Sequence, residues 1–342
     1  MPGDLASRTG GYAYARALLQ AMPETAWRLH HLPLPDGFPE PDGAALRLTA
    51  EAFARQPSDR PLLVDGLAYG CLPPALLQAH AGRWLALVHH PLALENGLSA
   101  ARAAALRDSE TQALAAAEGV VVTSPETARV LAADFGVPAR AITVAEPGTI
   151  RPAEPAKGGG AVPRLLCVGT VSPRKGQDVL VEALSRLRGL AWHCRLIGST
   201  DRAPETTRQL REAIVAAGLE ARVELAGEVA PEAMEGCYAE ADIFVLPSRY
   251  EGYGMAFAEA LAHGLPVVAC PTGAVPQTVP AAAALFVPPD DPRALAEALT
   301  RLLRDRALRQ EKAAAAWDWG RRLPQWSDTA RRVAAALDRM AP

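Results

Sequence analysis

Short apolar runs of strand length alternate with longer amphipathic stretches along most of the chain. Segments between the runs, such as residues 177–188 and 204–217, have the apolar spacing of helices. Strands that alternate with helices form parallel sheets covered by helices, and continuously apolar strands are typical of sheets buried on both faces. The pattern therefore predicts an α/β fold. The predicted strands lie at residues 62–64, 85–88, 120–122, 142–144, 165–168, 194–197, 222–225, 243–246 and 267–269.

A stretch rich in proline and glycine, residues 151–163, interrupts this alternation and predicts an interdomain linker. The alternation restarts at Arg164, and a chain of 342 residues is long enough for two domains of ordinary size. We therefore predict two doubly wound domains, at residues 1–157 and 158–310. Residues 311–342 are expected to form C-terminal helices that pack back toward the first domain.

The first domain lacks the strand expected at its start. Thr9-Gly10-Gly11 has the pattern of a loop and residues 12–22 that of a helix, but residues 1–8 do not have the pattern of a strand. In a doubly wound sheet the first strand is central. We expect the true start of the protein to lie upstream, or the sequence to be truncated. The alternative is a natural short variant with an altered sheet.

Charge and cysteine content narrow the class of protein. The chain has 35 Lys and Arg against 38 Asp and Glu, a formal net charge of −3, which argues against a protein that coats nucleic acid. The five cysteines form no CxxC pair and are expected to be reduced, mostly buried thiols. No apolar run reaches the roughly 18 residues of a membrane helix, and the N-terminus lacks the pattern of a signal peptide. We therefore expect a soluble, cytoplasmic protein.

The segment 247–266 carries the strongest chemical signal. It follows a buried strand, and Gly252 and Gly254 allow a ligand to approach the backbone where a helix begins, which is a typical phosphate site. Glu251 and Glu259 lie roughly 12 Å apart on helical rise. That exceeds the separation of roughly 5 to 9.5 Å in a glycosidase pair. We expect the two carboxylates to hold two ends of one elongated ligand, since they accept hydrogen bonds from sugar hydroxyls. A solvated glutamate at each position is the alternative.

A second strand–loop–helix segment, residues 168–177, places Arg174 and Lys175 together at a helix start. Two cations are unfavourable there unless an anion is bound, and Arg and Lys both bind phosphate. The segment predicts a phosphate-binding loop, with two solvated loop cations as the alternative.

Two further groups of candidate residues lie in the first half. His89 and His90 follow a strand and predict hydrogen bonds to substrate oxygens rather than zinc ligation, because no Cys or His lies nearby at zinc-ligand spacing. Gly10 and Gly11 lie at the start of a helix. Two glycines there either allow a ligand to approach the backbone or form a plain turn. Asp65, Ser124 and residues 147–148 also follow strands and are candidates to border a ligand-binding cleft. Ser124 is equally consistent with a helix cap.

Together these segments resemble the retaining glycosyltransferases of family four (glycosyl transferases group 1), whose GT-B fold has two Rossmann-like domains facing a cleft. Glu251 and Glu259 match the E-x7-E pattern, and residues 169–176 match the phosphate-binding loop. Residues 241–248 and 264–269 match the flanking signatures. The resemblance covers nearly the whole chain and is strongest between Arg164 and Leu303.

The resemblance implies a role for each candidate residue. Glu259 would bind the ribose of a sugar nucleotide, and Glu251 would hydrogen-bond the donor sugar. Arg174 and Lys175 would neutralise the diphosphate leaving group, and one of His89 and His90 would donate to the donor sugar. The other implied donor-binding residues are Thr9, Gly10, Gly11, Gly169, Thr170, Gly252, Tyr253, Gly254 and Met255.

The implied activity is transfer of a hexose from a UDP- or GDP-linked donor to a glycan, lipid or small-molecule acceptor, with retention of configuration. We expect no metal and no cofactor, because no DxD-like motif lies in a suitable loop and fixed cations with a helix end can stabilise the leaving group. The Arg/Trp-rich stretch 321–326 leaves open a peripheral membrane contact or a packed terminal helix.

Two departures from the family pattern leave other functions open. Thr170 stands where many members have Arg, and Gln277 where Glu is common; we expect Arg174 to supply the missing charge. One alternative is a catalytically impaired member that binds a sugar nucleotide or a partner protein, which the absent first strand favours. The other is a nucleotide-sugar epimerase, which would need acid/base carboxylates facing the sugar ring.

Overall fold

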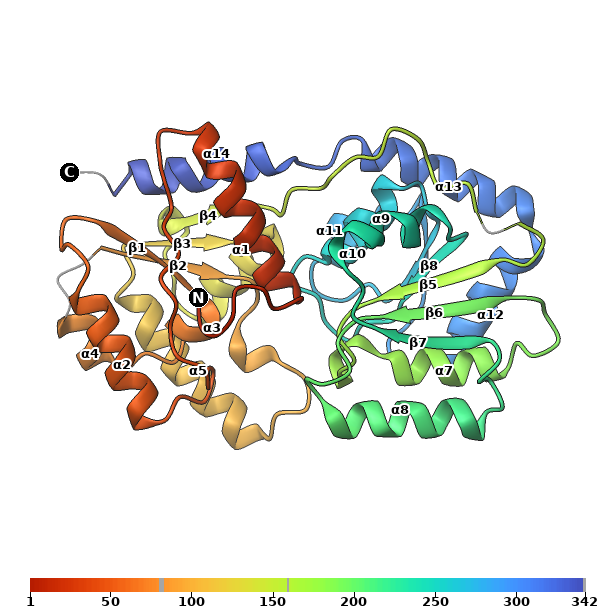
Figure 1. Ribbon diagram of the computed structural model, residues 1–342, viewed down its shortest axis with the longest axis horizontal. Helices are drawn as coiled ribbons and strands as arrows, with labels where there is room; N and C mark the ends of the chain where they lie inside the picture. The colour runs from red at the N-terminus through yellow and green to blue at the C-terminus, as the bar shows by residue number, and fades with distance from the viewer. Residues whose placement is uncertain (80–82, 159, 341–342) are drawn as a thin grey trace. The chain divides into compact units, whose positions relative to one another are not determined.

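The computed structural model describes residues 1–79, 83–158 and 160–340, which form two compact units. The first unit comprises Met1–Gly148 and the C-terminal segment from Pro324, and the second comprises Thr149–Leu323. Both are α/β units with parallel sheets, as the alternating pattern predicts (Figure 1).

The first unit has a parallel sheet in which the four described strands lie in chain order. The strands are β1 (Pro61–Asp65), β2 (Arg83–Val88), β3 (Gly119–Val122) and β4 (Ile142–Val144). The helices are α1 (Gly10–Ala21), α2 (Gly43–Ala54), α3 (Gly66–Tyr69), α4 (Pro74–Ala79), α5 (Ala100–Ala115), α6 (Pro125–Asp134) and α14 (Trp326–Asp338), with short 3-10 turns η1 (Met22–Glu24), η2 (Leu92–Leu94) and η3 (Ala139–Ala141).

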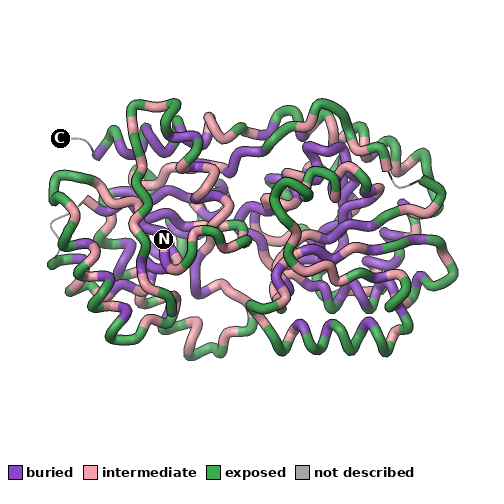
Figure 2. The backbone as a smooth tube through the Cα atoms, in the orientation of Figure 1, coloured by how far each residue is buried: buried purple, intermediate pink, exposed green. Residues whose placement is uncertain are grey.

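Alternate residues of these strands enter two separate cores. Leu85 and Leu87 of β2 pack with α1 and α14, whereas Trp84 and Ala86 pack into the core that includes Leu106 of α5. Successive side chains of a strand point to opposite faces, so a sheet covered on both sides needs apolar residues at every position. This explains the continuously apolar strands of the sequence, which lie buried in the interior of each unit (Figure 2).

The second unit has a six-stranded parallel sheet in the order β10-β9-β8-β5-β6-β7. The strands are β5 (Arg164–Val168), β6 (His193–Ile197), β7 (Val223–Gly227), β8 (Ile243–Leu246), β9 (Val267–Ala269) and β10 (Ala284–Phe286). The helices are α7 (Gln177–Ser185), α8 (Pro204–Ala216), α9 (Pro231–Ala239), α10 (Met255–Ala262), α11 (Val275–Thr278), α12 (Pro292–Arg304) and α13 (Arg306–Gly320), with a 3-10 turn η4 (Pro173–Lys175).

The unit boundaries correct the predicted division at residue 157. The proline- and glycine-rich stretch is attached to the second unit, because the amides of Ala156 and Lys157 donate to the carbonyls of His263 and Ala239. The predicted C-terminal segment is also divided. Helix α13 stays in the second unit, where it packs on α10, and α14 belongs to the first unit, where it packs on α1.

The residues before α1 form no strand among those described. Their one strand-like feature is an isolated parallel bridge between Pro2 and Leu34. The expectation of a further strand upstream therefore stays a prediction. No helix within the described residues is both long and apolar enough to cross a membrane. All five cysteines are free thiols; Cys71 and Cys237 are partly exposed, and the other three are buried.

Glu110 of α5 makes the stability of the first unit depend on pH. Burial raises the pKa of this carboxyl to about 8, although the amide of Leu92 donates a hydrogen bond of 2.9 Å to it. Between the pKa values of the unfolded and folded states, the folded state binds more protons, so the free energy of unfolding decreases as pH rises.

We predict that Glu110→Gln removes most of this dependence between about pH 5 and pH 8. At about pH 7 the variant should be more stable than the wild type by about 1–2 kcal/mol, because its amide carries no charge. The gain is no larger because the amide leaves buried donors unpaired. Urea unfolding across this pH range measures the effect, with exposed Glu24→Gln in η1 as a control. Parallel pH profiles of wild type and Glu110→Gln would contradict it.

Candidate functional site

Two loops of the second unit meet at the carboxyl ends of adjacent strands. The loop 169–176 follows β5, and the loop 247–254 follows β8, which pairs with β5. The amide of Arg249 donates to the carbonyl of Arg174 at 2.8 Å, which joins the loops directly. The strand order reverses here, because β6 lies on one side of β5 and β8 on the other. In open α/β sheets this switch point is where ligands bind.

The two loops bring three predicted site residues together. Lys175 Nζ lies 2.6 Å from Glu251 Oε1, and Arg174 Nη1 lies 3.4 Å from Glu251 Oε2. The hydroxyl of Ser248 also donates to Glu251 Oε1 at 2.6 Å. Glu251 is only 4% exposed. This Lys175–Arg174–Glu251 cluster is thus a buried charge network with one more cation than anion.

The electrostatics keep Glu251 ionised. Burial alone would raise the pKa of its carboxyl, but Lys175, Arg174 and the hydrogen bond from Ser248 together lower it below its usual value. Burial lowers the pKa of Lys175, and Glu251 offsets only part of this effect. An ionised carboxylate accepts hydrogen bonds and cannot donate them. Glu251 can therefore bind hydroxyl groups but is poorly suited to act as a general acid.

Glu259 lies on α10 in a different environment. Burial raises the pKa of its carboxyl, and the hydroxyl of Tyr238 limits this rise by donating to Oε2 at 2.7 Å. The Tyr238 ring stacks on His263, with centroids 4.9 Å apart, and His263 Nδ1 lies 2.7 Å from the carbonyl of Glu259. The E-x7-E pattern therefore gives one carboxylate held by cations and another held by an uncharged hydroxyl.

We predict that Tyr238→Phe destabilises the protein by about 1–2 kcal/mol, because it removes the hydrogen-bond donor to Glu259. The loss should be larger near pH 8 than near pH 5, since the hydroxyl stabilises the ionised carboxylate. Urea unfolding at both pH values measures it. The matched control is Tyr69→Phe, whose buried hydroxyl has no hydrogen-bond partner among the described residues. An equal loss of stability at both pH values would show that the Tyr238 hydroxyl does not stabilise the ionised carboxylate of Glu259.

The start of α10 has the backbone geometry predicted for an anion site. Gly254, its N-cap, has φ +90°, a conformation that favours glycine, and an added Cβ would lie 2.7 Å from the Phe257 ring. The first N–H groups of a helix have no partner within it and carry partial positive charge. Tyr253 is buried, and its carbonyl accepts from the Thr278 hydroxyl at 2.7 Å. These contacts fix the turn from Gly252 to Met255.

Gly169 and Thr170, the other predicted site residues of the loop 169–176, support Lys175. An added Cβ on Gly169 would lie 3.3 Å from the Lys175 side chain, so the lysine packs along this backbone. The carbonyls of Gly169 and Thr170 both accept hydrogen bonds of 3.2 Å from the side-chain amide of Gln177. Here Thr170 contributes its backbone to the loop.

In the first unit, the structure brings His89 to the start of α1. An added Cβ on Gly11 would lie 3.4 Å from the His89 ring, and Tyr14 makes an edge contact with that ring at 5.2 Å. His89 Nε2 lies 3.3 Å from Asp65 Oδ2, within ion-pair distance. Thr9 is the N-cap of α1 and Gly10 its first residue, although the Thr9 side chain makes no capping hydrogen bond. These residues form the predicted group around the double glycine.

The two adjacent histidines have different partners. His90 turns to Glu95, with Nε2 3.0 Å from Oε2, whereas His89 lies beside Asp65 and Gly11. His89 is therefore the histidine that lies beside the predicted glycine loop. Ser124 is a helix cap, because its hydroxyl accepts from the amide of Thr127 at 3.0 Å.

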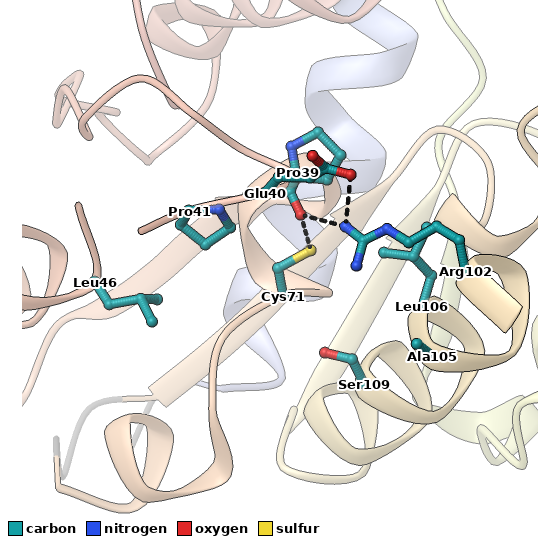
Figure 3. A pocket seen from close by; sticks show the side chains of 9 residues that line it. All are labelled: Pro39, Glu40, Pro41, Leu46, Cys71, Arg102, Ala105, Leu106 and Ser109. Carbon is teal, nitrogen blue, oxygen red and sulfur yellow. Dashed lines mark hydrogen bonds and ion pairs between the residues drawn. The ribbon is translucent and has the colours of Figure 1, made fainter. Parts of the chain in front are cut away.

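Sequence reasoning missed several contributors to both units. Ser248, Tyr238 and His263 hold the two glutamates, but isolated Ser, Tyr and His residues have no sequence signature for that role. A pocket of about 470 Å³ in the first unit was also not predicted (Figure 3). There Arg102 lies 3.1 Å from Glu40, and Cys71 Sγ donates to the carbonyl of Pro39 at 3.2 Å. No group of three or more His, Cys, Asp or Glu placed to hold a metal occurs in the described part of the chain.

Comparison with known proteins identifies a family for the second unit. Residues 162–305 match the family model described as "Glycosyl transferases group 1". A D-inositol 3-phosphate glycosyltransferase of Xylanimonas cellulosilytica is 32% identical over 246 residues, which cover 67% of this chain and 58% of the relative. Mannosylfructose-phosphate synthase of Agrobacterium fabrum is 33% identical over 166 residues, 44% of this chain and 37% of the relative. The chain thus spans about half the length of these curated relatives, or less.

Solved structures show the same fold over nearly the whole chain. Sucrose-phosphate synthase of Thermosynechococcus elongatus has a TM-score of 0.83 at 22% identity and covers 98% of this chain and 96% of its own. Anabaena HepE in complex with UDP and glucose has a TM-score of 0.74 at 16% identity and covers 98% of both chains. These likenesses confirm the predicted fold class, the GT-B fold with two Rossmann-like units.

Proposed function

Because residues 162–305 match the family model described as "Glycosyl transferases group 1", we propose that this chain is a retaining glycosyltransferase. It moves a hexose from a nucleotide-sugar donor to an acceptor in glycan, polysaccharide or glycolipid synthesis. The Lys175–Arg174–Glu251 cluster carries the proposal. It places two cations of the loop 169–176 beside an ionised carboxylate of the loop 247–254 at the switch point of the sheet, and the second of these loops leads into α10.

The cations and the start of α10 serve the leaving group. Glycosyl transfer builds negative charge on the departing diphosphate, and preorganised cations with helix N–H groups stabilise such charge without reorganisation. Lys175 has three N–H donors, so one phosphate oxygen and Glu251 can both be bound. Arg174 is fixed by a hydrogen bond of 2.9 Å to the carbonyl of Tyr250. The residues thus supply the charge that a metal ion supplies elsewhere, and we propose that transfer needs no metal and no cofactor.

The two glutamates bind the two ends of the donor. Glu251, held ionised between cations, accepts hydrogen bonds from hydroxyls of the sugar. Glu259 accepts hydrogen bonds from the ribose hydroxyls, which add to the one that it receives from Tyr238. Neither glutamate is needed as a nucleophile if the acceptor attacks on the same face from which the diphosphate departs. In that case a leaving-group oxygen takes the acceptor proton, and configuration is retained.

The first unit contributes donor and acceptor contacts. His89, which lies beside Gly11, is the proposed hydrogen-bond donor to the donor sugar, and Thr9, Gly10 and Gly11 are the proposed contacts of the diphosphate. We propose that the first unit binds the acceptor, a glycan, lipid or small molecule. Relatives are named for GDP-mannose, and HepE was solved with UDP. UDP- and GDP-linked hexoses are therefore the donors proposed here, and the cytoplasm is the proposed compartment.

Turnover of nucleotide sugars tests the proposal. The purified chain is incubated with UDP- and GDP-linked hexoses, with and without EDTA, and released nucleoside diphosphate is measured. We expect slow hydrolysis of one donor that EDTA does not abolish and a simple alcohol acceptor accelerates, with an α-glycoside formed from an α-linked donor. Release of no diphosphate from any donor would contradict a transferase. Interconversion of donors without release would indicate an epimerase.

A further inference from the structure

One buried polar side chain of the second unit, that of Gln177, is bonded to the backbone of the loop 169–176. Gln177 is the first residue of α7 and is only 3% exposed. Its side-chain amide donates to the carbonyls of Gly169 and Thr170, each at 3.2 Å. A side-chain amide has two N–H donors. Gln177 therefore uses its whole donor group on two neighbouring carbonyls of the predicted phosphate-binding loop.

The acceptor of the same side chain is left without a hydrogen bond. Gln177 Oε1 is buried, and no group among the described residues donates to it. A buried acceptor without a partner destabilises a protein, and an apolar side chain of similar size would avoid that cost. Packing alone therefore does not explain a glutamine here. The two N–H groups, which an apolar side chain lacks, are what this residue gives the loop.

Close packing against Gly198 also holds the carbonyl of Gly169. Gly198 directly follows β6 and has φ +146°, and an added Cβ would lie 2.2 Å from the Gly169 carbonyl oxygen. Only a glycine allows the two backbone segments to approach so closely. The Gly169 carbonyl thus has the Gln177 amide and the Gly198 backbone as neighbours. It would have to leave both in order to turn toward a ligand.

The segment that Gln177 holds carries groups suited to an anion. The amides of Gly169 and Val171 donate to carbonyls at the end of β6, at 2.8 and 2.9 Å. The amide of Thr170, between them, has no hydrogen-bond partner among the described residues. The side chain of Lys175 packs along Gly169, 3.3 Å from an added Cβ. A free N–H group and the stem of a cation therefore belong to, or rest on, the backbone that Gln177 fixes.

We propose that Gln177 is a positioning residue for the diphosphate, which holds the carbonyl oxygens of Gly169 and Thr170 away from the anion. The loop then presents the Thr170 N–H group and Lys175 Nζ instead. Carbonyl oxygens carry partial negative charge and repel phosphate, whereas loops that bind anions do so through N–H groups. Gln177 itself does not contact the donor. This inference rests on the proposed function, because that function assigns the diphosphate to Lys175.

Calorimetry on the full chain tests this role, with UDP, GDP and the corresponding monophosphates as probes. Gln177→Met keeps the length of the side chain and removes both donors. We expect it to weaken binding of the diphosphate about tenfold. The loss for the monophosphate should be smaller, since that probe lacks the second phosphate. A merely structural role would lower stability in urea and leave the affinities of the folded chain unchanged.

The matched control is Gln209→Met on α8, where an exposed glutamine bonds to Glu205. It should bind every probe as the wild type does. If Gln177→Met does not fold, Gln177→Leu replaces it. A folded Gln177 variant with wild-type affinity for the diphosphate, or with equal losses for diphosphate and monophosphate, would overturn the positioning role alone. Failure of the wild type to bind either diphosphate would overturn the proposed function, and this inference with it.

Discussion

Replacing Lys175 with alanine should lower the rate of donor cleavage roughly 100- to 1000-fold, the usual cost of losing one preorganised group that stabilises developing charge. Lys175 Nζ lies 2.6 Å from Glu251, so the change removes both a leaving-group cation and the main partner of that carboxylate. The effect should fall mainly on kcat, because charge on the diphosphate is largest in the transition state. Initial rates of nucleoside diphosphate release over a range of donor concentrations measure it.

The chain offers a matched control for this variant. Lys157 belongs to the same unit, has a side chain 82% exposed and forms an ion pair with the exposed Glu154. Lys157→Ala should retain the wild-type rate. Since Lys175→Ala leaves the buried Glu251 with Arg174 and Ser248 as partners, thermal unfolding is measured in parallel to separate lost catalysis from lost folding. A folded Lys175→Ala protein with unchanged kcat would show that the cation does not serve the leaving group.

Gly176→Ala should destabilise the second unit by about 4 kcal/mol, through backbone strain and overpacking together. Gly176 has φ +68°, and an added Cβ would lie 2.2 Å from the carbonyl oxygen of Pro247. The turn cannot move away freely, because the loops that contain Gly176 and Pro247 carry Lys175 and Glu251. The variant should therefore also lose donor binding at temperatures where it is still folded.

Urea unfolding measures the loss in stability, with Gly189→Ala as the control. An added Cβ on Gly189 meets no atom within 4 Å, and its backbone is outside the left-handed region. That substitution should change stability by less than about 0.5 kcal/mol. Equal stability of the two alanine variants would show that the loops separate more easily than their contacts indicate.

The strands and loops of both units could be predicted because their signals are local. Each of the nine predicted apolar runs overlaps a strand, and the loops with Arg174 and Glu251 follow β5 and β8 as expected. The short strand β10 (Ala284–Phe286) was missed because the residues around it are rich in alanine, which has a low propensity for strands. The linker was assigned by composition alone, which does not reveal that Ala156 and Lys157 bond to the second unit.

The pairings inside the site could not be predicted, because they join residues far apart in the chain. Lys175 and Glu251 are 76 positions apart, and only the adjacency of β5 and β8 brings them together. From the sequence we assigned Lys175 to the phosphates and Glu251 to the sugar, but the sequence does not show that these two side chains contact each other. Likewise, nothing in the sequence distinguishes His89 from His90, whereas the structure gives them Asp65 and Glu95 as separate partners.

Binding of a nucleoside diphosphate, measured by calorimetry on the full chain, tests the central claim most directly. We predict that either UDP or GDP binds at one site per chain without added metal. The affinity should fall about tenfold or more in Lys175→Ala, a loss of roughly 1.4 kcal/mol or more, and stay unchanged in Lys157→Ala. Equal affinity of wild type and Lys175→Ala, or no binding of either nucleotide to the folded chain, would contradict the assignment of this cluster as the donor site.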